Sequence, residues 1–136
     1  MSQMIDLTLP STVPGRTLHA FRCVPEGEVR AILQLSHGMV EFIDRYKPLA
    51  ESLAQRGILV TGNDHLGHGG SIRTKADYGY FAEPDGNRAV LADLHAMTVR
   101  TKELYPDVPY FLLGHSMGSF YARQYLCEYG RELDGA

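Results

Sequence analysis

Cysteine, excess positive charge and long apolar runs are scarce or missing in this sequence of 136 residues. The two cysteines, Cys23 and Cys127, are too few for a disulfide scaffold, and a reduced setting fits them. The 13 basic and 16 acidic residues give a net charge of -3, which argues against a nucleic-acid or anionic-membrane surface. No apolar run approaches the ~18 residues of a membrane span. The first residues also lack the basic start and apolar core of a secretory signal. We therefore expect a cytoplasmic domain with no nucleic-acid partner and no transmembrane segment.

The order of predicted elements points to an α/β fold. Alternating apolar residues predict a strand over 4–9, and a second strand over 17–24 would pair with it, antiparallel, at the edge of a sheet. Three strand–helix units follow, with strands over 29–35, 58–60 and 110–113 and helices from about 48 to 57, 87 to 105 and 116 to 129. This rhythm implies right-handed crossovers and a mainly parallel sheet with helices on both faces. Cys127 falls in the last helix, where a cysteine more often packs in the core than reacts.

Residues 114–118, Gly-His-Ser-Met-Gly, match the G-x-S-x-G pattern of a nucleophile elbow. The pattern directly follows a predicted buried strand and directly precedes a predicted helix, as an elbow requires. The sharp turn would expose the hydroxyl of Ser116, and side chains at Gly114 and Gly118 would collide with the neighbouring strand and helix. At the helix N-terminus, the N–H of Met117 can stabilise an oxyanion. Ser116 is therefore the candidate nucleophile, and the alternative is a glycine-rich helix start without chemistry.

A second oxyanion donor is expected from the loop that follows the first buried strand. That loop is 37–41, His-Gly-Met-Val-Glu, and the N–H of Met39 would complete the hole opposite Met117. A plain turn, with His37 bonded to backbone, is the alternative for His37 and Gly38. The two interpretations are compatible, because a well-fixed turn holds the N–H in place.

Four segments together resemble the monoacylglycerol lipase and lysophospholipase group of α/β-hydrolases, which is grouped with serine aminopeptidase-like hydrolases. They are residues 37–41, 45–46, 63–71 and 114–118, in this order and spacing. The resemblance implies a serine hydrolase that cleaves carboxylic esters of monoacyl lipids, with Ser116 as nucleophile, Met39 and Met117 as oxyanion hole, and neither cofactor nor metal. The supporting positions would be His37, Gly38, Glu41, Gly114, His115 and Gly118. Val40 and Ser119 depart from the family pattern, which usually has glycine there, and both departures look tolerable.

The two other members of a catalytic triad are not evident in the sequence. In this fold they follow the serine in the order acid, then histidine. All six histidines precede Ser116. His37, or His65 and His68 together, are alternative bases, but none occupies the family position. Asp64 with His65 and His68 could also bind zinc, although a separate further ligand is lacking.

We therefore expect residues 1–136 to be the N-terminal half of a single α/β-hydrolase domain. The C-terminal strands, the lid, the triad acid and the triad histidine would lie elsewhere, and residues 133–136 would approach a sixth strand. A small acyl ester or a lipid would be the substrate. Two alternatives remain open: a serine aminopeptidase of the same fold, and an inactive half-domain that needs a second chain.

Overall fold

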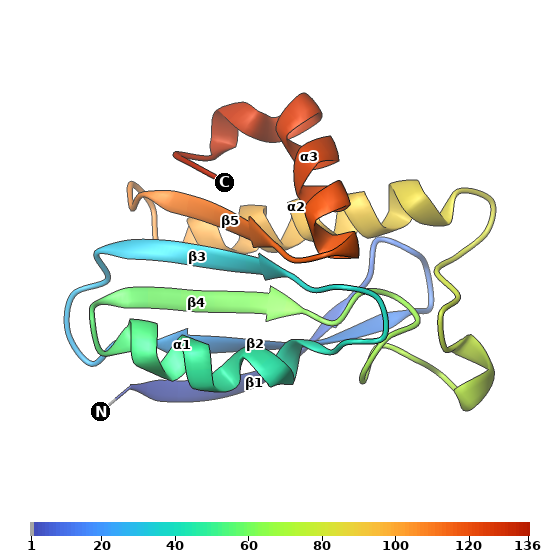
Figure 1. The fold of residues 1–136 in the computed structure, drawn as a ribbon, viewed down its shortest axis with the longest axis horizontal. Coiled ribbons are helices and arrows are strands. Elements are labelled where there is room, and N and C mark those ends of the chain that lie inside the picture. Colours follow the sequence, from blue (N-terminus) through green and yellow to red (C-terminus); the bar gives the residue numbers. More distant parts are fainter. Residues whose placement is uncertain (1) are drawn as a thin grey trace.

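A computed structural model describes residues 2–136 as a five-stranded mixed sheet with helices on both faces (Figure 1). The strands are β1 (Gln3–Pro10), β2 (Thr17–Val24), β3 (Ala31–Ser36), β4 (Ile58–Asn63) and β5 (Tyr110–Gly114). Their order in the sheet is β1-β2-β4-β3-β5. β2 pairs antiparallel with both β1 and β4, whereas β3 runs parallel to β4 and β5. The antiparallel pair and the parallel strands predicted from the sequence are both confirmed.

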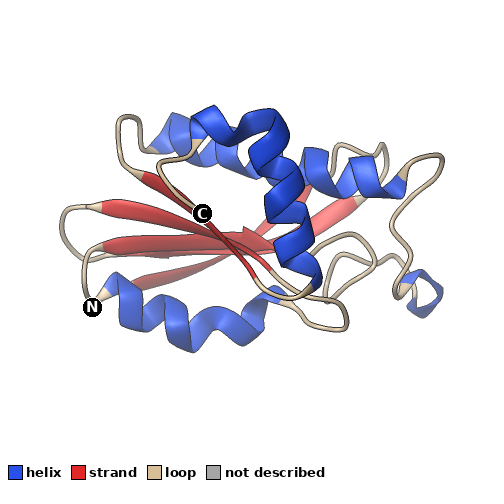
Figure 2. Cartoon of the chain, turned by 45° about the horizontal axis from the view of Figure 1, so that its top comes forward, coloured by secondary structure: helices blue, strands red, loops and turns tan. Residues whose placement is uncertain are grey.

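The helices form two layers around this sheet. Their bounds are α1 (Lys47–Ala54), α2 (Gly86–Leu104) and α3 (Met117–Tyr129), with short 3-10 turns η1 (Ile43–Tyr46), η2 (Lys75–Asp77) and η3 (Gly130–Glu132). In Figure 2, α1 lies on one side of the sheet and α2 and α3 lie on the other. Proline in its first turn suits the start of α1, and Gly57, with φ of 84°, supplies the left-handed residue that follows it.

Each helix layer packs against the sheet in an apolar cluster of its own. The α1 side is built from Phe21, Cys23, Leu35, Ile43, Ala50, Ala54 and Val60. The α2 and α3 side is built from Val90, Leu91, Leu94, Leu112, Tyr121, Ala122 and Tyr125. One buried polar side chain, Gln34 of β3, donates to the carbonyl of Leu94 at 3.0 Å and accepts from the hydroxyls of Thr98 and Tyr110. Both polar atoms of this buried amide therefore have hydrogen-bond partners in the core, as buried amides need.

Two expectations require correction. β4 extends to Asn63, beyond the predicted end at residue 60, because Ala20 of β2 pairs with Asn63 and continues the ladder. Cys127 is exposed on α3, so the prediction that it packs in the core is wrong. The face of α3 that packs against α2 carries Tyr121 and Tyr125 instead.

The last residues lie along the free edge of β5. The N–H of Asp134 donates to the carbonyl of Tyr110 at 2.7 Å, and the N–H of Leu112 donates to the carbonyl of Gly135 at 3.1 Å. Phe111 and Gly135 form a parallel bridge. These residues thus run parallel to β5 along its edge. Within residues 2–136, no helix combines the length and apolar character that crossing a bilayer requires.

Candidate active site

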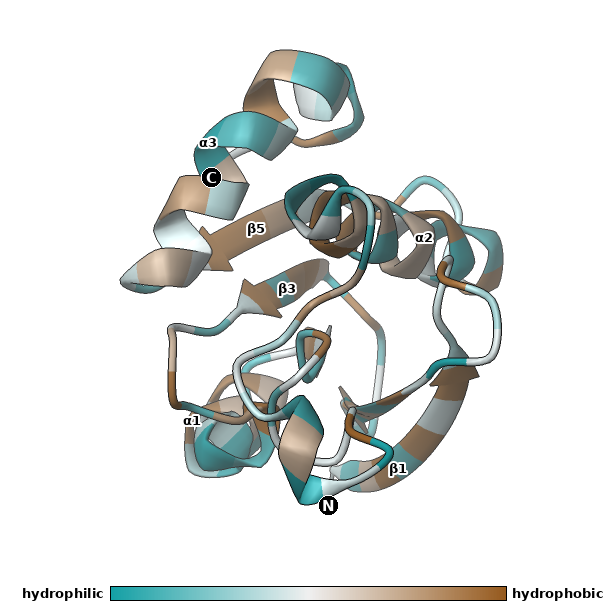
Figure 3. Cartoon of the chain, turned by 90° about the vertical axis from the view of Figure 1, so that its right-hand side faces the viewer, coloured by the Kyte–Doolittle hydropathy of each residue, from teal (hydrophilic) through white to brown (hydrophobic). Residues whose placement is uncertain are grey.

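Ser116 stands at a sharp turn between the end of β5 and the start of α3. Its φ of 55° and ψ of -123° lie in a region that L-residues rarely adopt, at a cost of roughly 1–3 kcal/mol. The side chain is exposed and makes no capping hydrogen bond to the helix. Figure 3 looks onto this end of the sheet, where β3 and β5 end and α3 begins. The strained turn therefore presents a hydroxyl group that no other part of the described chain engages.

The two flanking glycines leave no room for a side chain. A Cβ at Gly114 would lie 2.5 Å from the carbonyl oxygen of Gly118, and a Cβ at Gly118 would lie 1.8 Å from the carbonyl oxygen of Ser36. Both distances fall far inside van der Waals contact. Glycine at 118 consequently allows α3 to approach the end of β3, and glycine at 114 allows β5 to turn directly into α3.

The loop after β3 lies directly against this turn. A Cβ at Gly38 would be 3.1 Å from the Cβ of Ser116. Met39 follows, with 60% of its surface exposed. Within residues 2–136, neither the backbone N–H of Met39 nor that of Met117 donates a hydrogen bond. The structure thus brings the two loops together and leaves both N–H groups available to a third group.

Glu41 joins the loop to the turn. Its carboxylate accepts hydrogen bonds from Nδ1 of His115 at 2.8 Å and from the Tyr46 hydroxyl at 2.7 Å. Burial alone raises the pKa of Glu41, but these two bonds outweigh it and hold the pKa below its usual value. Burial and the bond to Glu41 raise the pKa of Tyr46 to about 12. The carboxylate is therefore ionised and the phenol neutral near pH 7.

His37 and His65 hold the backbone of neighbouring loops. Nε2 of His37 accepts from the backbone N–H of His65 at 3.0 Å, and its Nδ1 donates to the carbonyl of Gly38 at 2.7 Å. Nε2 of His65 donates in turn to the carbonyl of His37 at 3.0 Å. Burial lowers the pKa of both rings, so both are neutral. Neither ring is brought to Ser116, nor is His68, which donates to the carbonyl of Leu66. The three alternative bases are thus not paired with the nucleophile.

The side chain of Asp64 also serves backbone groups rather than a metal. One oxygen accepts from the N–H of Ile43 at 2.6 Å and the other from the N–H of Gly70 at 2.8 Å. Asp64 therefore ties the start of η1 to the loop that follows β4. Among residues 2–136, the ligand atoms of Asp64, His65 and His68 do not converge as a possible zinc site requires.

A different group of possible ligands does converge among residues 2–136, namely Asp6, His19 and Asp44. The ammonium group of Lys47 lies 2.9 Å from Asp6 and 3.6 Å from Asp44. This cation is already paired with both carboxylates, so the group forms a surface ion network.

Two sets of these contacts are not predicted by the sequence. Glu41 and His115 are expected only as separate supporting positions, since no local pattern links residues 74 positions apart. The two backbone hydrogen bonds of Asp64 are also not predicted, although an acidic residue directly after a buried strand is a signal that could indicate them.

The family described as serine aminopeptidase, S33, matches residues 27–136. A monoglyceride lipase homolog of Monkeypox virus is 41% identical over 93 residues, which cover 66% of this chain and 30% of that protein. The monoglyceride lipase of Rattus norvegicus is 38% identical over 122 residues, which cover 83% of this chain and 35% of that protein. The chain thus spans about a third of the length of the curated relatives that it matches.

The fold is shared with solved structures. A highly thermostable carboxyl esterase from Bacillus coagulans superposes on 97% of this chain with a TM-score of 0.88 and 31% sequence identity. The matched part is 42% of the esterase chain. The arrangement of sheet, helices and elbow turn described above is therefore one that a carboxyl esterase also has.

Proposed function

The chain belongs to the serine aminopeptidase, S33 family of α/β-hydrolases, and on this premise we propose that it carries the nucleophile and oxyanion hole of a serine hydrolase. The proposed reaction is the cleavage of carboxylic esters of monoacyl lipids. One observation carries the proposal: the exposed Ser116 hydroxyl lies on a strained turn that packs against the loop after β3. The N–H of Met39 in this loop and the N–H of Met117 at the start of α3 make no hydrogen bond within residues 2–136. Strained backbone of this kind gathers at reactive positions.

In the proposed mechanism, Oγ of Ser116 attacks the acyl carbonyl carbon while its proton passes to a general base. The carbonyl electron pair moves to oxygen, and the N–H groups of Met39 and Met117 stabilise the negative charge. Collapse breaks the ester bond, and the leaving oxygen takes the proton from the base and departs as the alcohol. Water then hydrolyses the remaining acyl-enzyme to the carboxylic acid. Each N–H donor is expected to supply about 3–4 kcal/mol of transition-state stabilisation.

The base and its acid are proposed to come from outside residues 2–136. No histidine or carboxylate in this part of the chain hydrogen-bonds to Ser116. Further residues of the natural protein or a second chain would supply them. Without a base, the oxyanion hole and binding would leave a residual acceleration of roughly 10³–10⁴-fold over water.

Apolar side chains around the loop support a lipid substrate. Met39, Val40 and Phe42 are exposed, and they line a cavity of about 410 Å³ together with His68 and Tyr78. An exposed apolar patch beside a nucleophile is suited to a substrate with a hydrocarbon chain. The identity with monoglyceride lipases favours a monoacyl ester in particular.

A fluorophosphonate probe tests the nucleophile. The natural protein that contains this chain should be labelled at Ser116, and Ser116→Ala should abolish both labelling and ester hydrolysis. Ser119→Ala is the matched control, because this neighbouring serine donates only to the carbonyl of Ser116. Labelling that survives Ser116→Ala would refute the assignment.

Two further candidates each rest on one observation. The family description favours an aminopeptidase, and parallel assays with a monoacylglycerol and an aminoacyl amide would separate the two activities. The lack of a base beside Ser116 in residues 2–136 favours an inactive half-domain that binds a second chain. Mass spectrometry of the native material would detect such a chain.

A further inference from the structure

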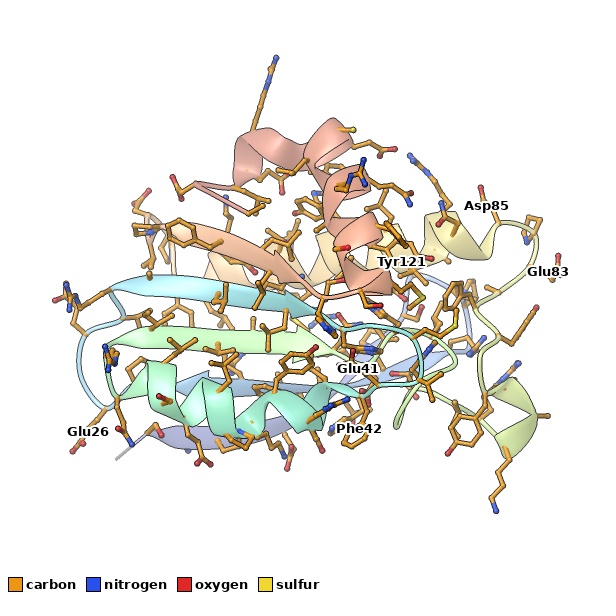
Figure 4. All side chains as sticks on the ribbon, viewed as in Figure 1. Glu26, Glu41, Phe42, Glu83, Asp85 and Tyr121 are labelled. Carbon is orange, nitrogen blue, oxygen red and sulfur yellow. The ribbon has the colours of Figure 1, made fainter. Side chains whose placement is uncertain are left out.

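The hydrogen bond between Glu41 and His115 joins the loop after β3 to the elbow turn at Ser116. Within residues 2–136, it is the only hydrogen bond that connects residues 38–42 with residues 114–118. The last backbone hydrogen bond between β3 and the elbow runs from the N–H of His115 to the carbonyl of Ser36 at 3.1 Å. Beyond Ser36 the loop leaves the sheet. Figure 4 shows Glu41 at this point, where the end of β3 meets the start of α3.

The carboxylate is held from two directions. Its side chain is 8% exposed, and burying a charge at this level is costly unless hydrogen bonds compensate. Oε1 accepts from Tyr46 at the end of η1, and Oε2 accepts from His115, whose own side chain is 66% exposed. The elbow is thereby connected through Glu41 to the beginning of α1.

The same carboxylate passes directly over Gly38. A Cβ at Gly38 would lie 2.5 Å from Oε2 of Glu41 and 3.2 Å from the carbonyl oxygen of His115. Glycine at this position therefore lets the carboxylate reach across the loop to the histidine. The contact sets how closely the loop approaches the elbow.

We propose that Glu41 is a positioning residue for catalysis, acting through His115 to hold the N–H of Met39 at the correct distance from the N–H of Met117. The inference rests on the proposed function. Two donors stabilise one oxyanion only when both lie about 2.7–3.1 Å from it. A displacement of ~1 Å in such a site can lower the rate by ~100-fold.

The first test is Glu41→Gln in the natural protein, assayed with a p-nitrophenyl ester. Glutamine removes the negative charge, so both charge-assisted hydrogen bonds are replaced by weaker, neutral contacts at most. We expect kcat to fall by roughly 10- to 100-fold with little change in KM. Affinity for a boronic acid that forms a tetrahedral adduct on Ser116 should fall by a similar factor. The matched control is Glu51→Gln on the exposed side of α1, which should leave all three values unchanged.

A double-mutant cycle tests whether Glu41 acts through His115. His115→Phe keeps a ring but removes Nδ1, and it should lower kcat by about the same factor as Glu41→Gln. The double variant should be no slower than the slower single variant, because both substitutions break one contact. Multiplicative losses would overturn the inference.

The NMR order parameter of the Met39 N–H vector provides a readout that does not depend on turnover. It should be lower in Glu41→Gln than in Glu51→Gln, with no change for the residues of β1. An unchanged order parameter and unchanged kcat, in a protein with Ser116-dependent turnover, would overturn the positioning role and leave the proposed function standing. A natural protein without Ser116-dependent turnover would overturn both.

Discussion

The Cα of Gly118 packs so tightly against the carbonyl oxygen of Ser36 that a Cβ built on it would lie 1.8 Å from that oxygen. This contact joins the first turn of α3 to the end of β3. Ser36 precedes the loop of the second oxyanion donor, and Gly118 follows the candidate nucleophile by two residues. Backbone atoms alone therefore determine how far the end of β3 lies from the start of α3. No side-chain adjustment can relieve a clash at this point.

We predict that Gly118→Ala destabilises the protein severely. The added methyl group must displace either β3 or α3, which overpacks the core at a cost of at least about 3 kcal/mol. Chemical denaturation should show the loss in the free energy of unfolding. Gly27→Ala is the control, since no atom lies within 4 Å of a Cβ there. Equal stability of the two variants would contradict the prediction.

Val40 adopts a backbone conformation that suits glycine. Its φ is 60° and 89% of its surface is exposed, so a β-branched residue bears left-handed strain without gaining burial. The strain of roughly 1–2 kcal/mol exceeds the entropic cost of glycine, roughly 0.5–1 kcal/mol. We expect Val40→Gly to raise the thermal midpoint by about 2–4 °C. Val40→Ala, which keeps a Cβ, should give less than half this gain, and an unchanged midpoint in Val40→Gly would disprove the strain.

The buried histidines predict a loss of stability in mild acid. Burial lowers the pKa of His65, and likewise of His37, below the value in the unfolded chain. As the pH falls below about 6.5, the unfolded chain therefore takes up protons that the folded protein does not, and stability decreases. Each residue contributes a slope of at most about 1.4 kcal/mol per pH unit.

Denaturant titrations between pH 7.5 and pH 5 would measure this slope. His65→Gln should reduce it, because a glutamine Nε2 can still donate to the carbonyl of His37 but does not titrate. Identical slopes for the variant and the unmodified protein would show that His65 does not contribute.

The two thiols should differ in reactivity. Cys127 is exposed, whereas Cys23 is buried and burial raises the pKa of its thiol. Iodoacetamide should add one label to the native protein, at Cys127, and a second only after unfolding. Mass spectrometry of Cys127→Ser should find no label on the native protein. A label on Cys23 under native conditions would show that the apolar cluster around Cys23 opens readily.

The local features of the sequence predicted the elements well. β2 has the predicted bounds, 17–24, and the strand–turn–helix around Ser116 follows directly from the spacing of Gly114 and Gly118. Alternation, helical periodicity and the demand for glycine at a tight turn all act within a few residues. Such signals can therefore be read without knowing what the chain packs against.

Only the tertiary structure decided which distant groups meet. Asn63 belongs to β4 because Ala20 pairs with it, and Cys127 faces outward because another side of α3 packs on α2. The bond from Glu41 to His115 spans 74 positions and leaves no periodic trace in the sequence. The sequence by itself thus determined the order of elements and the elbow, since these depend on short-range sterics. The fold decided the strand order, the exposed faces and the link between the two loops, since these depend on contacts between residues far apart in the chain.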